Sequence, residues 1–221
     1  PDYTGLATAA DNCSGVTLTQ VPAPGTVVGA GTTNIVLTAT DGSSNTANCN
    51  FDVAVSDDIN PTITCPANQV ESLDASCNFT LPDYTGLATA ADNCSGVTLT
   101  QVPTPGTVVG AGTTNIVLTA TDGYSNTANC NFDVVVSDNT NPTITCPADQ
   151  VGLVDASCNF TLPDYTGLAT AADNCSGVTV MQVPTPGTVV GTGTTNIVLT
   201  ATDGSSNTAN CNFDVVVSDD T

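Results

Sequence analysis

The chain has no lysine, arginine or histidine among its 221 residues, so no basic side chain offsets its formal charge of −21. Binding to nucleic acid requires cationic side chains that neutralise phosphates, and binding to anionic membrane surfaces requires the same charges. Both functions are excluded for this sequence. Histidine bases, lysine Schiff bases and imidazole metal ligands are also absent, so the sequence predicts that the protein is not an enzyme.

Long apolar runs and tryptophan are missing as well. Runs such as Val134–Val136 are far too short to span a bilayer, and no membrane insertion is predicted. Hydrophobic residues nevertheless make up 40% of the chain, which indicates a folded core and not a disordered acidic tail. The sequence starts in the middle of a repeat without an initiator methionine, so we interpret it as part of a longer, processed protein.

What the sequence does contain is a repeat of 81 residues. Residues 1–57 and 82–138 differ at only three positions. An active site needs one unique constellation, whereas an architectural protein uses many equivalent units, so the repeats favour a structural role. The predicted domains are a partial repeat without its opening strands at 1–57, a complete repeat at 58–138, and a complete repeat with the start of the next linker at 139–221.

The repeat has the alternating pattern of β-strands. Residues 115–121 and 130–137 each place every second apolar side chain on one face, and the Asp122–Asn126 turn between them predicts a hairpin. The inward residues are Ile116, Leu118, Ala120, Phe132, Val134 and Val136. Shorter strands are predicted at 62–65, 69–73, 77–81, 96–102 and 107–109.

About seven short strands without helices in each repeat predict an all-β fold. The specific prediction is a tandem array of immunoglobulin-like antiparallel β-sandwich domains. The linkers are too short for free tumbling, which predicts an extended rod.

Several strings in order resemble the hyalin repeat, or HYR domain. The turn at 204–207 departs from the family, which usually closes it with Gly-Asn. The resemblance covers both complete repeats and implies an immunoglobulin-like extracellular module, commonly in tandem and associated with adhesion and matrix. The matching strings are Asn141–Pro147, Ala172–Val178, Gly193–Thr195, Thr200–Asp203 and Cys211–Val217.

The predicted function is therefore that of an extracellular structural or adhesive repeat protein, secreted or on the cell surface, which forms a rod or filament with like subunits. If Pro1 is a true terminus, another chain could supply the missing opening strands by β-strand addition. One alternative is an adhesin module that binds surface glycans or a receptor. Another is a passive spacer in a larger secreted enzyme.

The ten cysteines recur at fixed positions without a Cys-x-x-Cys arrangement, which predicts disulfides and an oxidising compartment. Four cysteines in a unit allow three connectivities. In a sandwich of the resembled topology, the loop after the second strand and the start of the last strand lie at the same end. This favours Cys94 with Cys130, Cys175 with Cys211 and Cys13 with Cys49, and leaves Cys65 with Cys77 and Cys146 with Cys158.

Carboxylates and amides gather at the junctions between repeats. Oxygen ligands from two domains around an Asp-x-x-Asn-Pro linker resemble the calcium-stiffened linkers of cadherins and predict Ca²⁺ as a cofactor. The alternative is that these groups are solvated charges on surface loops. The replacement of Glu71 by Gly152 in the next repeat weakens the calcium prediction and favours this alternative. The candidate ligands are Asp57, Asp58, Asn60, Asp92, Asp122, Asp138, Asn139, Asn141, Asp173 and Asp203.

Glycosylation sequons begin at Asn78 and Asn159, and Asn-Cys-Ser triplets begin at Asn12, Asn93 and Asn174. These predict surface glycans in a host that has the machinery.

Overall fold

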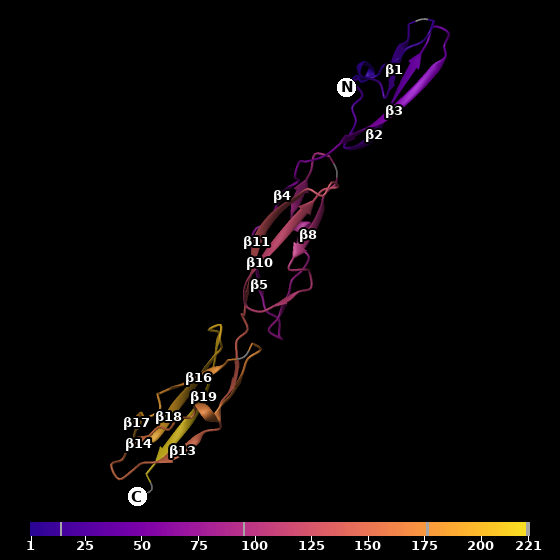
Figure 1. Cartoon of the computed structure of the whole chain (residues 1–221). Coiled ribbons are helices and arrows are strands. Elements are labelled where there is room, and N and C mark those ends of the chain that lie inside the picture. Colours follow the sequence, from indigo (N-terminus) through magenta and orange to yellow (C-terminus); the bar gives the residue numbers. More distant parts are fainter. Residues whose placement is uncertain (14, 95, 176, 220–221) are drawn as a thin grey trace. The chain divides into compact units, whose positions relative to one another are not determined.

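The computed structural model describes residues 1–13, 15–94, 96–175 and 177–219 (Figure 1). The chain divides into two compact units. Unit 1 contains the N-terminal repeat and one end of the second repeat. Unit 2 contains the other end of the second repeat and the third repeat. Unit 1 comprises Pro1–Cys65, Thr85–Thr100 and Leu118–Cys130, and unit 2 comprises Pro66–Tyr84, Gln101–Val117 and Asn131–Thr221.

In each repeat, short strands are followed by two long consecutive strands, and three 3₁₀ helices lie among the short strands. Of the helices among the described residues, none is long and apolar enough to cross a membrane. The N-terminal repeat holds η1 (Thr4–Leu6), β1 (Thr17–Val21), β2 (Gly31–Thr40) and β3 (Thr46–Val55). The second repeat holds β4 (Thr62–Thr64), β5 (Gln69–Ser72), β6 (Phe79–Thr80), η2 (Thr85–Leu87), β7 (Thr89–Ala91), β8 (Thr98–Val102), β9 (Val108–Val109), β10 (Gly112–Thr121) and β11 (Thr127–Ser137). The third repeat holds β12 (Thr143–Thr145), β13 (Gln150–Leu153), β14 (Phe160–Thr161), η3 (Thr166–Leu168), β15 (Thr170–Ala172), β16 (Thr179–Val183), β17 (Val189–Val190), β18 (Gly193–Thr202) and β19 (Thr208–Ser218).

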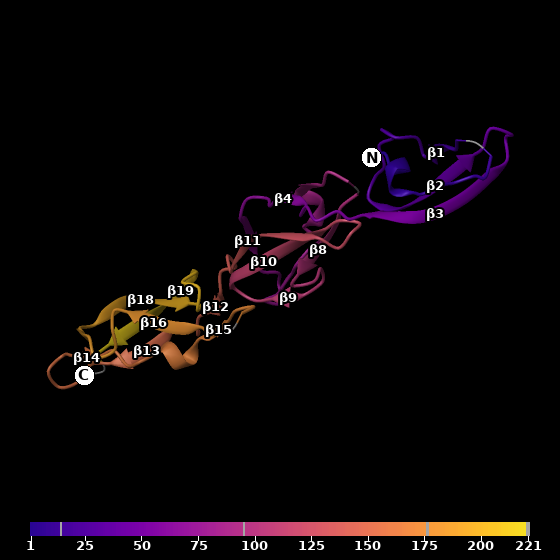
Figure 2. The same ribbon diagram turned by 45° about the horizontal axis from the view of Figure 1, so that its top comes forward.

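The third repeat, in unit 2, shows the full architecture of one repeat. Its main sheet has the order β13-β19-β18-β16, and β12 and β15 form a small sheet beside it (Figure 2). The pair β14-β17 forms a second small sheet. The long hairpin β18-β19 pairs residues from Gly193 opposite Val217 to Thr202 opposite Thr208. The second repeat has the same arrangement, with the sheet order β5-β11-β10-β8.

The core lies on one face of this hairpin, because alternate side chains of a strand point to the same face. Leu199 and Val215 are fully buried, and Phe213 meets Tyr165 edge to face with ring centroids 5.3 Å apart. The other members of this buried cluster are Leu162, Ile197 and Val217.

The predicted all-β fold and the predicted hairpin are confirmed. Ile116, Leu118 and Ala120 have no exposed surface, and the turn is closed by a hydrogen bond from the Asp122 amide to the Asn126 carbonyl. The antiparallel sandwich needs one correction, because β5 pairs with β11 and β13 pairs with β19 in parallel. The strands β7 and β15 were not predicted, since a run of Thr-Ala-Ala has no alternating pattern.

A buried glutamine organises each repeat and was also not predicted. Gln101 accepts a hydrogen bond at 2.7 Å from the Tyr84 amide and donates to the carbonyl oxygens of Pro82 and Pro103 at 3.1 Å. Val102-Pro103 is a cis peptide bond. Because the amide oxygen accepts one hydrogen bond and the amide nitrogen donates two, all to backbone partners, the side chain is satisfied by the protein itself.

Candidate functional site

Three carboxylates meet where the N-terminal repeat passes into the second repeat, within unit 1. Asp57 lies after β3, Asp92 directly follows β7, and Asp122 starts the turn after β10. One carboxylate oxygen of each lies within 4.8 Å of the others. Asp57 is only 8% exposed and Asp122 only 6%. Since β7 and β10 end at the same place, the fold brings together residues that are far apart in sequence.

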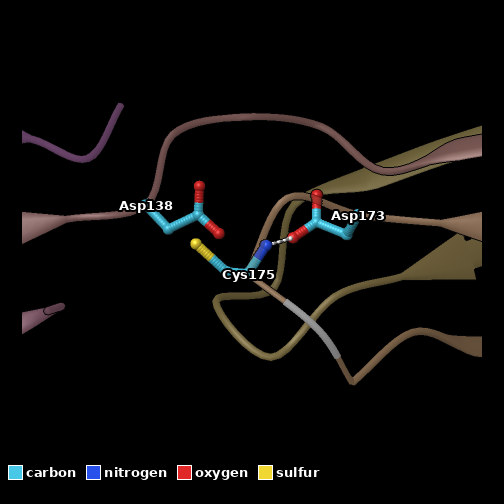
Figure 3. Close-up of side chains that lie close together, drawn as sticks. All are labelled: Asp138, Asp173 and Cys175. Atoms are coloured by element: carbon cyan, nitrogen blue, oxygen red, sulfur yellow. Dashed lines mark hydrogen bonds between the residues drawn. The ribbon is translucent and has the colours of Figure 1, made fainter. Parts of the chain in front are cut away.

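The equivalent junction between the second and third repeats lies in unit 2. Figure 3 shows Asp138 and Asp173 around Cys175, and the Cys175 amide donates to Asp173 at 2.8 Å. Atoms of these three residues lie within 4.8 Å of one another. The Cys175 sulfur is in a disulfide, so it is no thiolate ligand. Asp203, the counterpart of Asp122, is buried but does not belong to this group.

Each junction contains two buried carboxylate oxygens without a hydrogen-bonding partner among the described residues. At the first junction they are Asp57 Oδ2 and Asp92 Oδ1, and at the second they are Asp138 Oδ2 and Asp173 Oδ1. The other oxygen of each carboxylate is satisfied; Asp92 Oδ2, for example, accepts from the Cys94 amide at 2.9 Å. Two buried like charges at one place are unfavourable unless a cation or a proton compensates them. The arrangement therefore fits a bound cation.

The other four predicted ligands are linker residues that lie on the surface. Asp58, Asn60, Asn139 and Asn141 are exposed, and Asp58 is not a member of the carboxylate group of the first junction. Asn139 donates to the Ser72 hydroxyl at 2.8 Å. Carboxylate oxygens without imidazole or thiolate are the ligands that Ca²⁺ accepts, so the chemistry of the donor set suits calcium.

An asparagine in the hairpin turn of the second and of the third repeat holds the preceding linker at the junction. The Asn126 side-chain amide donates to the Asp57 carbonyl at 2.9 Å and to the Asp122 carboxylate at 2.8 Å. Asn207 repeats both contacts with Asp138 and Asp203. Neither asparagine was among the predicted site residues, although the Asp-x-x-x-Asn spacing is the signal that could have identified them.

Hydrogen-bond donors in the turn lower the pKa of the Asp203 carboxyl. Burial raises the pKa of Asp203, but hydrogen bonds from the Asn207 side chain and amide and from the amides of Ser205 and Ser206 outweigh it and hold the pKa below its usual value. A carboxyl whose pKa is lower in the folded state stabilises the fold above its unfolded pKa, near 3.9, and this contribution is lost as the pH falls through the folded value.

We therefore expect acid to open this turn before it melts the hairpin. Hydrogen exchange at the Asn207 amide, which donates to Asp203 at 2.8 Å, should accelerate as the pH falls below about 4, relative to the intrinsic rate. In Asp203→Asn the acceleration should disappear, because the asparagine does not titrate. An unchanged acid response in this variant would contradict the assignment.

The predicted disulfide pairing is wrong. The structure joins Cys65 to Cys130 and Cys146 to Cys211, each with a separation of 65 residues. It joins Cys77 to Cys175 across 98 residues, between two successive repeats. The predicted pairs assumed that every bond stays within one repeat and that Cys94 and Cys130 lie at the same end. Instead, Cys65, which follows β4, lies with its Cα 5.7 Å from that of Cys130 in β11. The loop that holds Cys77 contacts the next repeat. Four cysteines predicted to form disulfides are free: Cys13, Cys49, Cys94 and Cys158.

Cys94 lies beside the acidic group of the first junction. Burial raises the pKa of the Cys94 thiol, and the neighbouring carboxylates of Asp57, Asp92 and Asp122 raise it further. The thiolate is therefore disfavoured at this position.

The sequons at Asn78 and Asn159 lie in exposed loops. In the Asn-Cys-Ser triplets, Ser14, Ser95 and Ser176 lie outside the described residues, and Asn174 donates to the Asp74 carbonyl at 3.1 Å.

Repeated all-β units, together with acidic junctions and regularly spaced disulfides, define a tandem-repeat protein. Residues 5–55, 56–136 and 137–217 each match the HYR domain, and the chain belongs to this family.

Among curated proteins, hyalin of Strongylocentrotus purpuratus is 29% identical over 214 residues. The match covers 90% of this chain but only 17% of hyalin. Among solved structures, extracellular cadherin domains 3–6 of protocadherin gamma B2 align with 92% of this chain and 69% of theirs, at 13% identity and a TM-score of 0.40. Domains EC22–24 of mouse cadherin-23 align with 96% of this chain and 90% of theirs, at 16% identity and a TM-score of 0.38.

Proposed function

We propose that the chain is part of an extracellular structural or adhesive array of HYR repeats that binds Ca²⁺ at the junctions between successive repeats. The repeats, with boundaries near 57/58 and 138/139, are the building units, and arrays associate with like chains into a rod or filament. The observation that carries this proposal is the pair of buried, unpartnered carboxylate oxygens at each junction. The likeness to hyalin and the disulfides, which persist in oxidising compartments, support an extracellular location.

The residues that would hold the cation come from the linker and from the following repeat. Asp57 belongs to the linker, whereas Asp92 and Asp122 belong to loops of the second repeat. A cation bound by both parts would therefore restrain the linker against the repeat. Because the sequence has no lysine, arginine or histidine, no side chain can supply the positive charge that these carboxylates need.

Calcium titration of the 221-residue chain tests the proposal. If each junction binds with the dissociation constant of about 0.1–1 mM that is common for extracellular modules, 10 mM Ca²⁺ should stabilise each by about 1.4–2.7 kcal/mol. The melting temperature should rise accordingly, fall again with EDTA, and respond less to Mg²⁺, which retains its water ligands.

Asp57→Asn and Asp58→Asn form a matched pair for this test. Both remove one charge from the same linker, but Asp57 is buried in the carboxylate group and Asp58 is exposed. In isothermal titration, Asp57→Asn should weaken calcium binding at the first junction by roughly tenfold or more, whereas Asp58→Asn should change it by less than about twofold. Equal effects of the two variants, or a melting temperature insensitive to EDTA, would overturn the calcium proposal.

A further inference from the structure

The three disulfides of the structure overlap along the chain. Two of them each close a loop within one repeat, and the third begins inside the first loop and ends inside the second. The bonds are Cys65–Cys130, Cys77–Cys175 and Cys146–Cys211. Every residue from Cys65 to Cys211 therefore lies within at least one loop that a disulfide closes.

Tension applied to the two ends of this region follows the shortest covalent path. The path uses the bond within the second repeat, then residues 131–145, and then the bond within the third repeat. Residues 66–129 and 147–210 lie off this path. Because a disulfide closes each of these two loops, their unfolding cannot lengthen the path.

The backbone segment on the path has little length in reserve. Residues 131–137 belong to β11, and residues 143–145 form β12. A strand rises about 3.3 Å per residue, which is close to the limit of about 3.6 Å for a fully extended chain. Slack therefore remains only in the linker, residues 138–142, which lies outside the strands.

The disulfides set a low ceiling on the distance between Cys65 and Cys211. Cys130 and Cys146 are 16 residues apart, which allows at most about 58 Å between them. Each bond adds the 5.7 Å between its two Cα atoms, so the ceiling is about 70 Å. Without the bonds, the same region would reach about 530 Å when fully extended.

The third disulfide is a second connection between the repeats. If the backbone is cut in the linker, Cys77–Cys175 is the one covalent connection left between the second and third repeats among the described residues. The linker is where a protease cuts most easily, because residues 139–141 are exposed and lie outside any strand.

Hydrogen bonds hold both cysteines of this third bond in place. The Asp74 carboxylate accepts from the Asn78 amide at 3.0 Å, which closes the loop that contains Cys77. The Asn174 side chain donates to the Asp74 carbonyl at 3.1 Å and joins this loop to the one that contains Cys175. The two cysteines therefore meet where a side chain also connects the repeats.

We propose that residues 65–211 form a tether of fixed length. The disulfides and one extended segment carry its tension, and the Cys77–Cys175 bond keeps successive repeats joined when the linker is cut. Such a tether transmits force along an extracellular array even while its repeats unfold. The proposal depends on the disulfides alone, and not on cation binding or on association with like chains.

Single-molecule stretching of the 221-residue chain tests the fixed length. Handles are attached through thiol-free, non-natural side chains at the exposed positions Thr64 and Asn212, next to Cys65 and Cys211. We expect the contour length between the handles to stay below about 80 Å at every force short of covalent rupture, and to reach about 530 Å after reduction. A greater length without reductant, such as the roughly 200 Å that the pairing predicted from sequence allows, would contradict the proposal.

Paired variants separate the roles of the bonds. Cys77→Ser with Cys175→Ser should leave the contour length unchanged, because this bond is not on the shortest path. Cys65→Ser with Cys130→Ser should raise it to about 160 Å, because tension then crosses the Cys77–Cys175 bond. Cys158→Ser, which removes an exposed free thiol, is the matched control and should change nothing. Peptide mapping of each variant identifies its remaining disulfides before it is stretched.

Cleavage of the linker tests the second connection. A recognition site for a specific protease is inserted between Asn139 and Thr140, and the cut chain is analysed by denaturing electrophoresis. Without reductant the two fragments should migrate as one species, and with reductant as two. The same chain with Cys77→Ser and Cys175→Ser should give two fragments under both conditions, whereas the variant that lacks the bond within the second repeat should still give one.

Two further results would overturn the proposal. One is separation of the fragments without reductant when all the cysteines are present. The other is a contour length of about 300 Å in the variant that lacks the bond within the second repeat, because tension would then bypass Cys77–Cys175.

Discussion

Replacing Cys146 and Cys211 together by alanine should lower the free energy of unfolding of the third repeat by about 4 kcal/mol. This disulfide joins residues that are 65 apart in sequence. Loop-closure entropy for a chain of this length gives a value of this size, since the bond restricts the unfolded state more than the folded one. The repeat buries only a thin aliphatic core, so such a loss is a large part of its stability.

Hydrogen exchange of β18 and β19 in rising guanidinium concentration measures this change for the third repeat alone. Cys158→Ser is the matched control, because Cys158 is free in the structure but was paired with Cys146 in the sequence-based prediction. This variant should leave the exchange rates of the core unchanged. If Cys158→Ser destabilises the repeat as strongly as the double variant, the sequence-based pairing is right and the structural one is not.

Leu199→Ala should cost about 2–5 kcal/mol of unfolding free energy. Leu199 has no exposed surface and lies in the cluster with Ile197, Phe213 and Val215. The substitution removes buried methyl groups and leaves a cavity that the strands of a hydrogen-bonded sheet cannot close by moving.

Leu153→Ala in the same repeat is the control for the loss of a leucine. Its side chain is 55% exposed, so we expect a change within about 0.5 kcal/mol. Hydrogen exchange of β18 in the 221-residue chain can measure both variants. Equal costs for Leu199→Ala and Leu153→Ala would contradict the assignment of the core.

The β-strands and the direction of their side chains could be predicted because both depend on local pattern. Alternation along 115–121 identified Ile116, Leu118 and Ala120 as buried, since a strand turns successive side chains to opposite faces. The Asp-Gly turn identified the hairpin for a similarly local reason. The short strand β7 could not be predicted, because Thr-Ala-Ala becomes a strand only through its pairing with β4.

The candidate site could be predicted only in part from the sequence. Asp57, Asp92 and Asp122 were among the candidates, and the structure brings these three together. The sequence could not show that Asp57 belongs to the site and that Asp58 and Asn60 do not. The backbone conformation of the linker decides which of these side chains points into the site. The role of Asn126 likewise depends on the position of the Asp57 carbonyl, which belongs to a different repeat.

The sequence by itself determined the period, the all-β class, the HYR resemblance, the absence of cationic functions and the inward face of each long strand. Only the tertiary structure decided the disulfides. The reason is the near identity of the repeats: the pattern of cysteines along one repeat cannot show that Cys77 bonds to Cys175 of the following repeat. Bonding depends on which segments are neighbours in space, and identical local sequences carry no information about that.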